Sequence, residues 1–189
     1  GPIELAAHGI ALQVTSLAFM VHLGLSNAAT VRAGRAYGRG DIAGLRHGGY
    51  TVFGMSIVVA VVTVMIFLTL PEVLLGAFLD PTDPDTATVM LIGVGLLAAA
   101  ALFQLVDAAQ VMALGILRGV QDTRVPMVIA GVAYWIVGVP VSYLLGITFG
   151  LGGVGIWLGL AIGLAVAAVL LIWRFLRWQP KGIAVAPRA

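Results

Sequence analysis

The stretch Leu102-Phe103-Gln104-Leu105-Val106-Asp107-Ala108-Ala109-Gln110 lies inside an apolar run, residues 87–117, in which Asp107 is the only acidic residue. Asp107 is ten residues from the end of that run, or about 15 Å along an α-helix, which is near the middle of a hydrocarbon core roughly 30 Å thick. An ionisable side chain at that depth is costly and normally faces a polar cavity or a partner. Gln104 and Gln110 flank Asp107 at helical spacing on one face. That face is the candidate ion site.

The composition excludes an ordinary soluble domain. Of the 189 residues, 61% are hydrophobic and only 10% are charged, whereas globular domains have about 25% charged residues. The net charge is +2, but the basic residues lie in short loops rather than on a patch with aromatic residues, so we expect no nucleic-acid partner. The absence of cysteine excludes disulfides and thiolate metal sites. The composition predicts an integral membrane protein embedded in a lipid bilayer.

Apolar stretches predict an all-α fold, a polytopic transmembrane helix bundle of about five spans. The third stretch is longer than a perpendicular span requires, so we expect it to tilt, kink or protrude. Pro140 inside the fourth stretch predicts a bend. Gly155, Gly159 and Gly163 recur every four residues in the fifth stretch and predict a small-residue ridge for close helix packing. The predicted spans cover residues 5–31, 48–70, 86–117, 126–149 and 152–178.

The charges predict the orientation. With five spans, all ten Lys and Arg residues fall on one side, and the acids of the second connection fall on the other. The positive-inside rule then predicts a multi-pass protein of the inner (plasma) membrane with a cytoplasmic C-terminus and an outside N-terminus. Arg118 and Arg124 are predicted as cytoplasmic anchors, with Asp122 as their ion-pair partner. An outside N-terminus without an initiator Met or a signal peptide favours a fragment that lacks upstream spans.

Several segments resemble the multidrug and toxic compound extrusion (MATE) family of transporters, in its NorM-like branch. Residues 11–34, ALQVTSLAFMVHLGLSNAATVRAG, resemble the second helix of the C-terminal lobe, and residues 38–41, GRGD, resemble the loop that follows it. Phe103-Gln104 with Asp107 and Gln110, followed by residues 117–119 (LRG) and 122–127 (DTRVPM), resembles the tenth helix and the turn into the eleventh. The resemblance covers nearly the whole chain.

The resemblance implies a two-lobed antiporter of twelve helices that exports small organic cations in exchange for H⁺ or Na⁺ and needs no other cofactor. Residues 1–189 would be part of its C-terminal lobe, helices eight to twelve, and their partners would be the N-terminal lobe and the seventh helix. In this branch of the family the coupling cation binds an acid on the tenth helix, which corresponds to Asp107. Asp107 is therefore the expected cation-coupling residue and, if the ion is Na⁺, its metal ligand.

The chain departs from the family at three positions. Some members carry an aromatic hydroxyl where this chain has Phe19 or Phe103, and the usual proline after the Phe-Met pair is His22. A hard cation such as Na⁺ needs several oxygen ligands. Without the two hydroxyls, fewer such ligands surround Asp107. An apolar environment favours the protonated form of a carboxyl group. We therefore expect H⁺ coupling, with Na⁺ as the alternative.

Each candidate also has a structural interpretation. Asp107 is either the coupling group or a structural acid hydrogen-bonded to a neighbouring helix, and we favour coupling. Gln13, Ser16, Gln104 and Gln110 are possible cavity-lining residues, but such side chains more often join helices. His22 is either a proton relay or a packing histidine, and packing is favoured. Tyr134, Trp135 and Tyr143 are candidates for cation–π contacts with a drug, but packing and interfacial anchoring are favoured. Phe19 and Phe103 are possible cavity-lining residues.

Two alternatives to a multidrug antiporter remain open. A lipid-linked saccharide flippase of the same superfamily needs a strongly cationic cavity, whereas the cations of this chain fit loops and ends. A partial bundle that does not transport by itself is the second alternative. An intramembrane enzyme is not expected, because Asp107 is the only intramembrane acid and no His-Glu-x-x-His pair is present.

Overall fold

The computed structural model describes residues 1–179, and in that range every regular element is helical. This confirms the predicted all-α bundle. Five helical spans are long and apolar enough to cross a membrane. Their elements are α1 (Pro2–Gly38), α2 (Ile42–Thr69), α4 (Thr86–Gly119), the fourth span built from α5 (Arg124–Val132), η1 (Ala133–Gly138), α6 (Val139–Tyr143) and η2 (Leu144–Thr148), and α7 (Gly152–Arg177).

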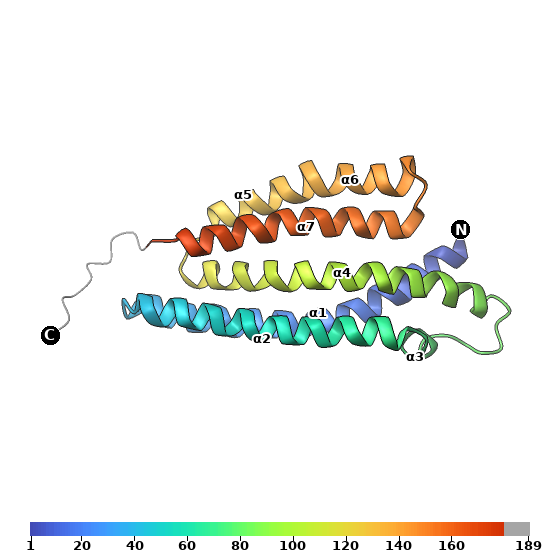
Figure 1. The fold of residues 1–189 in the computed structure, drawn as a ribbon, viewed down its shortest axis with the longest axis horizontal. Coiled ribbons are helices and arrows are strands. Elements are labelled where there is room, and N and C mark those ends of the chain that lie inside the picture. Colours follow the sequence, from blue (N-terminus) through green and yellow to red (C-terminus); the bar gives the residue numbers. More distant parts are fainter. Residues whose placement is uncertain (180–189) are drawn as a thin grey trace.

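The helix α4 is the centre of the bundle. In Figure 1 it lies between α1 and α2 on one side and α7 on the other, with the fourth span as an outer layer beside α7. Buried residues are spread around α4, among them Leu97, Asp107 and Met112, which is the pattern of a helix surrounded by others. Asp107, the only acidic residue of α4, therefore lies in the interior of the helix bundle.

Helices α1 and α2 extend beyond the predicted apolar runs. Helix α1 continues past Val31 to Gly38, and α2 begins at Ile42 rather than at residue 48. Hydropathy marks the part of a helix that lies in hydrocarbon, and polar residues such as Arg35 continue the same helix into the headgroup region. Asp41 caps α2 by accepting a hydrogen bond from the backbone N–H of Gly44 at 2.8 Å. A short helix, α3 (Pro71–Gly76), was not predicted.

The disturbance expected at Pro140 takes the form of wide helical turns. Pro140 lies in the first turn of α6, and the π-helical segments η1 and η2 flank this short helix. Proline lacks a backbone N–H and its ring displaces the preceding turn, and π turns are the local rearrangement that often accompanies such a site. Tyr134 belongs to η1, so this irregular segment sets its direction.

The predicted glycine ridge is confirmed. A Cβ added at Gly159 would lie 2.3 Å from the backbone N and Cα of Ser142, and one at Gly163 would lie 2.7 Å from the Cα of Gly138. At Gly155 the same atom would be 2.6 Å from the carbonyl of Leu145. The fourth span thus rests directly on the backbone of α7, and this contact fixes the position of Tyr134 relative to α4.

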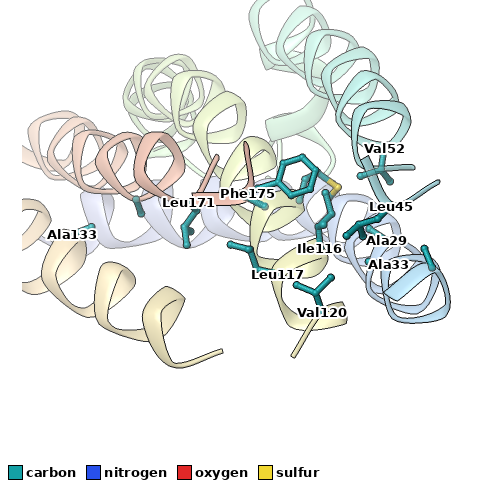
Figure 2. Close-up of a cluster of buried hydrophobic side chains, with 14 residues drawn as sticks. Ala29, Ala33, Leu45, Val52, Ile116, Leu117, Val120, Ala133, Leu171 and Phe175 are labelled. Atoms are coloured by element: carbon teal, nitrogen blue, oxygen red, sulfur yellow. The ribbon is translucent and has the colours of Figure 1, made fainter. Parts of the chain in front are cut away.

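Hydrogen bonds fix the register between α1 and α4. Ser26 Oγ donates to the carbonyl of Val111 at 2.8 Å, and Thr30 Oγ1 donates to the carbonyl of Gly115 at 2.8 Å. Beside them a hydrophobic cluster joins α1, α2, α4 and α7 (Figure 2), and its members include Ile116, Leu171 and Phe175. One end of the bundle is therefore tied together across four helices, which holds the α1 face next to Asp107 in place.

The predicted ion pair of Asp122 has a different partner. Arg174 Nε, at the end of α7, donates to Asp122 Oδ2 at 2.6 Å, whereas Arg118 and Arg124 form no ion pair within residues 1–179. Sequence proximity suggested the neighbouring arginines. The close packing of α4 on α7 instead brings the end of α7 to the α4–α5 turn.

Candidate functional site

Asp107 is a buried acid without a described partner. Its side chain is 7% exposed, and within residues 1–179 it takes part in no ion pair and no hydrogen bond. It faces the space between α1 and the fourth span, where it lines two cavities. The structure therefore places Asp107 at mid-helix, as the sequence predicted, beside two cavities of which the larger has a mostly apolar wall.

The larger cavity has a volume of about 470 Å³ and is lined by α1, α4, the fourth span and α7. It extends from Asp107 towards the N-terminal end of α1. Five other predicted site residues line it, and they are Ser16, Phe19, Phe103, Gln104 and Tyr134. No Lys or Arg of the described residues lies in its wall.

The smaller cavity has a volume of about 270 Å³ and extends from Asp107 towards the opposite end of α4. Gln110 and Arg118 line it, and Arg118 is eleven residues beyond Asp107, roughly 16 Å along the helix. Phe19, Asp107 and Tyr134 line both cavities. The acid and these two aromatic rings thus form the boundary between the two spaces.

The two glutamines present unsatisfied polar atoms around Asp107. Gln110 Nε2 donates to the hydroxyl of Tyr134, while Gln110 Oε1 has no partner among the described residues. Neither amide atom of Gln104 has a partner there, although its side chain is 1% exposed. Buried polar groups are nearly always hydrogen-bonded, to protein or to water. These polar atoms are therefore free to bind water, an ion or a polar group of a substrate.

The lining residues of the larger cavity that were not predicted from the sequence include Trp157 and His8. Trp157 Nε1 donates to His8 Nδ1 at 3.3 Å, which joins α7 to α1, and the ring of Phe103 packs edge-on against Trp157 at 5.2 Å between centroids. A buried tryptophan N–H usually needs an acceptor. The need for an acceptor could have marked Trp157 as a candidate from the sequence alone, but it does not identify His8 as that acceptor.

The structure does not bring three of the predicted residues to either cavity. Gln13 is exposed on α1, and Trp135 is 74% exposed on the outer face of the fourth span. His22 is 1% exposed and lines neither cavity, and its Nδ1 lies 3.3 Å from the carbonyl of Ala18. The helical rotation explains these positions, since Gln13 and His22 are turned away from the α1 face that carries Ser16 and Phe19.

The chemistry available at the site is that of a single carboxylate in an amide and aromatic environment. Within the part of the chain that the structure describes, no group of three or more His, Cys, Asp or Glu residues is close enough to hold a metal ion. A cation bound here would rely on Asp107, on the amide oxygens of Gln104 and Gln110, and on the Tyr134 hydroxyl. The arrangement offers one carboxyl group, with amide and hydroxyl oxygens near it, to a proton or a monovalent cation.

Comparisons with known proteins agree with one family. The family model described as MatE matches residues 1–144. The probable multidrug resistance protein NorM of Brucella suis is 47% identical over 98% of this chain and 40% of its own length. The probable multidrug resistance protein NorM of Rhizobium meliloti is 46% identical over 100% of this chain and 40% of its own length. The chain therefore spans about two fifths of these relatives.

A solved structure has the same fold. The crystal structure of the eukaryotic MATE transporter AtDTX14 superposes with a TM-score of 0.80, covering 94% of this chain and 39% of that protein. The sequence identity is 23%, so this likeness concerns the arrangement of the helices alone.

Proposed function

The chain belongs to the MatE family, and from this premise we propose that it is part of the C-terminal lobe, helices eight to twelve, of a secondary active transporter. That transporter exports small organic cations across the inner membrane in exchange for protons. Two relatives that the chain resembles carry the name multidrug resistance protein, and the present chain spans 40% of each. The N-terminal lobe and the seventh helix are the expected partners.

The observation that carries the proposal is the buried, unpartnered carboxyl group of Asp107 at the boundary of two cavities. A charged carboxylate in an apolar interior is strongly unfavourable unless a counter-charge accompanies it. Two species can remove that penalty, namely a proton on the carboxyl group or an organic cation beside it. Because both neutralise the same charge, their binding is mutually exclusive, which is the condition for exchange.

The surrounding residues suit an organic cation. Phe19, Phe103 and Tyr134 line the larger cavity with Asp107, and aromatic faces attract cations at short range. Gln104 offers both a donor and an acceptor without a described partner, which serves a polar group on the substrate. In the ionised form Asp107 binds the organic cation, and protonation from the outside releases it. Alternation of the cavity between the two sides of the membrane would make this cycle directional.

The orientation proposed with this function has a cytoplasmic C-terminus. Figure 1 shows that the α1–α2 turn, the α4–α5 turn and the end of α7 lie at the same end of the bundle. These segments carry eight of the ten Lys and Arg residues, at positions 32, 35, 39, 46, 118, 124, 174 and 177. Positive charges concentrate on the cytoplasmic side of membrane proteins. The larger cavity, by contrast, has no described cationic side chain, and the smaller one has only Arg118, whereas a flippase for an anionic lipid-linked saccharide needs a strongly cationic cavity.

Sodium is the second candidate for the coupling ion. The amide oxygens of Gln104 and Gln110 lack partners among residues 1–179, and together with Asp107 they offer the kind of hard oxygen ligands that Na⁺ prefers. The two positions where some family members have an aromatic hydroxyl are Phe19 and Phe103. Tyr134 provides one hydroxyl at the same cavities, and its oxygen keeps a second lone pair beside the bond that it accepts from Gln110, so the site offers one hydroxyl ligand in place of two. We keep the proton as the primary proposal.

Efflux from proteoliposomes under one gradient at a time tests the proposed function and its coupling ion. In the complete transporter, a pH gradient without Na⁺ should drive export of a fluorescent organic cation, and a Na⁺ gradient at equal pH should not. Export under the Na⁺ gradient alone would show that the ion coupled at Asp107 is sodium rather than the proton. Export under neither gradient would contradict the antiporter.

A further inference from the structure

A groove lies at the arginine-bearing end of the bundle, away from both cavities that Asp107 lines. Its volume is about 780 Å³, and it is formed by the end of α1, the α4–α5 turn with the start of α5, and the end of α7. None of its lining residues lines either of the two cavities at Asp107. The proposed transport cycle does not use this groove.

The groove has an excess of positive charge. Arg124, Arg174 and Arg177 line it together with one acid, Asp122. Arg174 Nε donates to Asp122 Oδ2 at 2.6 Å, which leaves most of its five N–H donors for another ligand. Arg124 is exposed and has no ion pair within the described residues. Guanidinium groups bind phosphate oxygens through paired hydrogen bonds, so three of them around one space favour a phosphate.

Aromatic residues place the groove at the membrane surface. Trp173 is 53% exposed, and the guanidinium carbon of Arg177 lies 4.8 Å from the centre of its ring. Tyr37 and Trp178 pack edge-on in the wall of the groove, with ring centroids 5.6 Å apart. Tryptophan and tyrosine concentrate at the level of the lipid headgroups. The half-exposed Val125 continues the wall with an apolar side chain, which suits the first part of an acyl chain.

We propose that this groove binds the headgroup of an anionic phospholipid from the leaflet at the arginine-bearing end. The charge complements a phosphodiester, and the tryptophans and Val125 complement the glycerol and upper acyl region. Cytoplasmic leaflets contain anionic lipids, and basic pockets between transmembrane helices are typical sites for their headgroups. Helix α5 begins at the groove without a side-chain cap, so its first free N–H groups add donors to those of the arginines. The bound lipid joins the ends of three spans.

Native mass spectrometry of the complete transporter in detergent tests the lipid site. Phosphatidylglycerol or phosphatidylcholine is added in defined amounts, and the wild type is compared with the double variant Arg124→Gln/Arg177→Gln. The matched control is Arg35→Gln/Arg46→Gln, which removes two exposed arginines at the same end but outside the groove. We expect the wild type and the control to retain phosphatidylglycerol, and the groove variant to bind it on the order of 10- to 30-fold more weakly. Phosphatidylcholine should be retained weakly by all three.

Equal retention of phosphatidylglycerol by the groove variant and the wild type would overturn the proposal. An equal loss in the control would also overturn it, because the attraction would then belong to the whole basic surface. If inorganic phosphate at millimolar concentration displaces the lipid, the ligand is a free phosphate and the lipid assignment is wrong. Arg124→Gln alone guards against misfolding, since Arg124 has no ion pair within residues 1–179, and it should still weaken lipid binding with an unchanged melting temperature.

Discussion

Asp107→Asn is expected to abolish export of organic cations under a pH gradient, to the level of vesicles without the protein, while the transporter stays folded. Asparagine has nearly the same shape as a protonated aspartate, but it neither releases a proton nor carries the charge that attracts the substrate. Among the described residues, Asp107 is the only acid lining the two cavities that meet at the site, so no other carboxylate of this chain replaces it there. The measurement is dye efflux from proteoliposomes that contain the complete transporter.

A matched control separates coupling from a general effect of removing an acid. Asp85 is exposed in the connection between α3 and α4, and its side chain caps no helix through a hydrogen bond. Asp85→Asn should therefore export at the wild-type rate. Thermal unfolding of both variants checks that each is folded. An Asp107→Asn variant that exports as fast as the wild type would make Asp107 a structural acid.

Among substitutions that add one methyl group to the surface of a helix, Gly159→Ala is expected to destabilise the lobe most. The new Cβ would lie 2.3 Å from the backbone N and Cα of Ser142, and backbone atoms cannot swing aside as a long side chain does. The fourth span must move away from α7, and extra volume in a packed interface costs about 1–3 kcal/mol or more. We expect a melting temperature several degrees lower. Transport should fall too, because Tyr134 belongs to the displaced span.

Gly24→Ala is the matched control for this substitution. A Cβ at Gly24 on α1 meets no atom within 4 Å, and alanine favours a helix by about 1 kcal/mol over glycine. Its melting temperature should be unchanged or slightly higher. Similar melting of the two variants would show that the contact between α7 and the fourth span is looser than its geometry implies.

The sequence was sufficient for the bundle and for its central acid. The hydropathy of five runs predicts the spans because the bilayer sets their length, and a lone acid at mid-span predicts a cavity or a partner beside it because its burial in hydrocarbon is so costly. The four-residue spacing of Gly155, Gly159 and Gly163 predicts a close helix contact for the same kind of local reason. Each of these inferences depends only on the sequence of one helix and on the membrane or water that surrounds it.

The features that were missed depend on two helices at once. The bond of Gln110 to Tyr134, the bond of Trp157 to His8 and the pairing of Asp122 with Arg174 are set by how distant segments pack. Hydropathy does not determine the rotation of α1, so the exposed Gln13 was counted with Ser16 as a cavity residue. Composition also does not show where a connection folds into a short helix, so the residues of α3 were predicted as part of a loop.

Proton release on substrate binding tests the role of Asp107 most directly. The purified complete transporter in a weakly buffered solution near neutral pH is mixed with an organic cation, and the protons released are counted. Proton and substrate neutralise the same carboxyl group, so each weakens the binding of the other by the same factor. Acidification should therefore lower the affinity for the substrate. We predict proton release from the wild type and none from Asp107→Asn, whose substrate affinity should not depend on pH. Binding by the wild type without proton release, or an unchanged release from the variant, would contradict the assignment of Asp107 as the coupling acid.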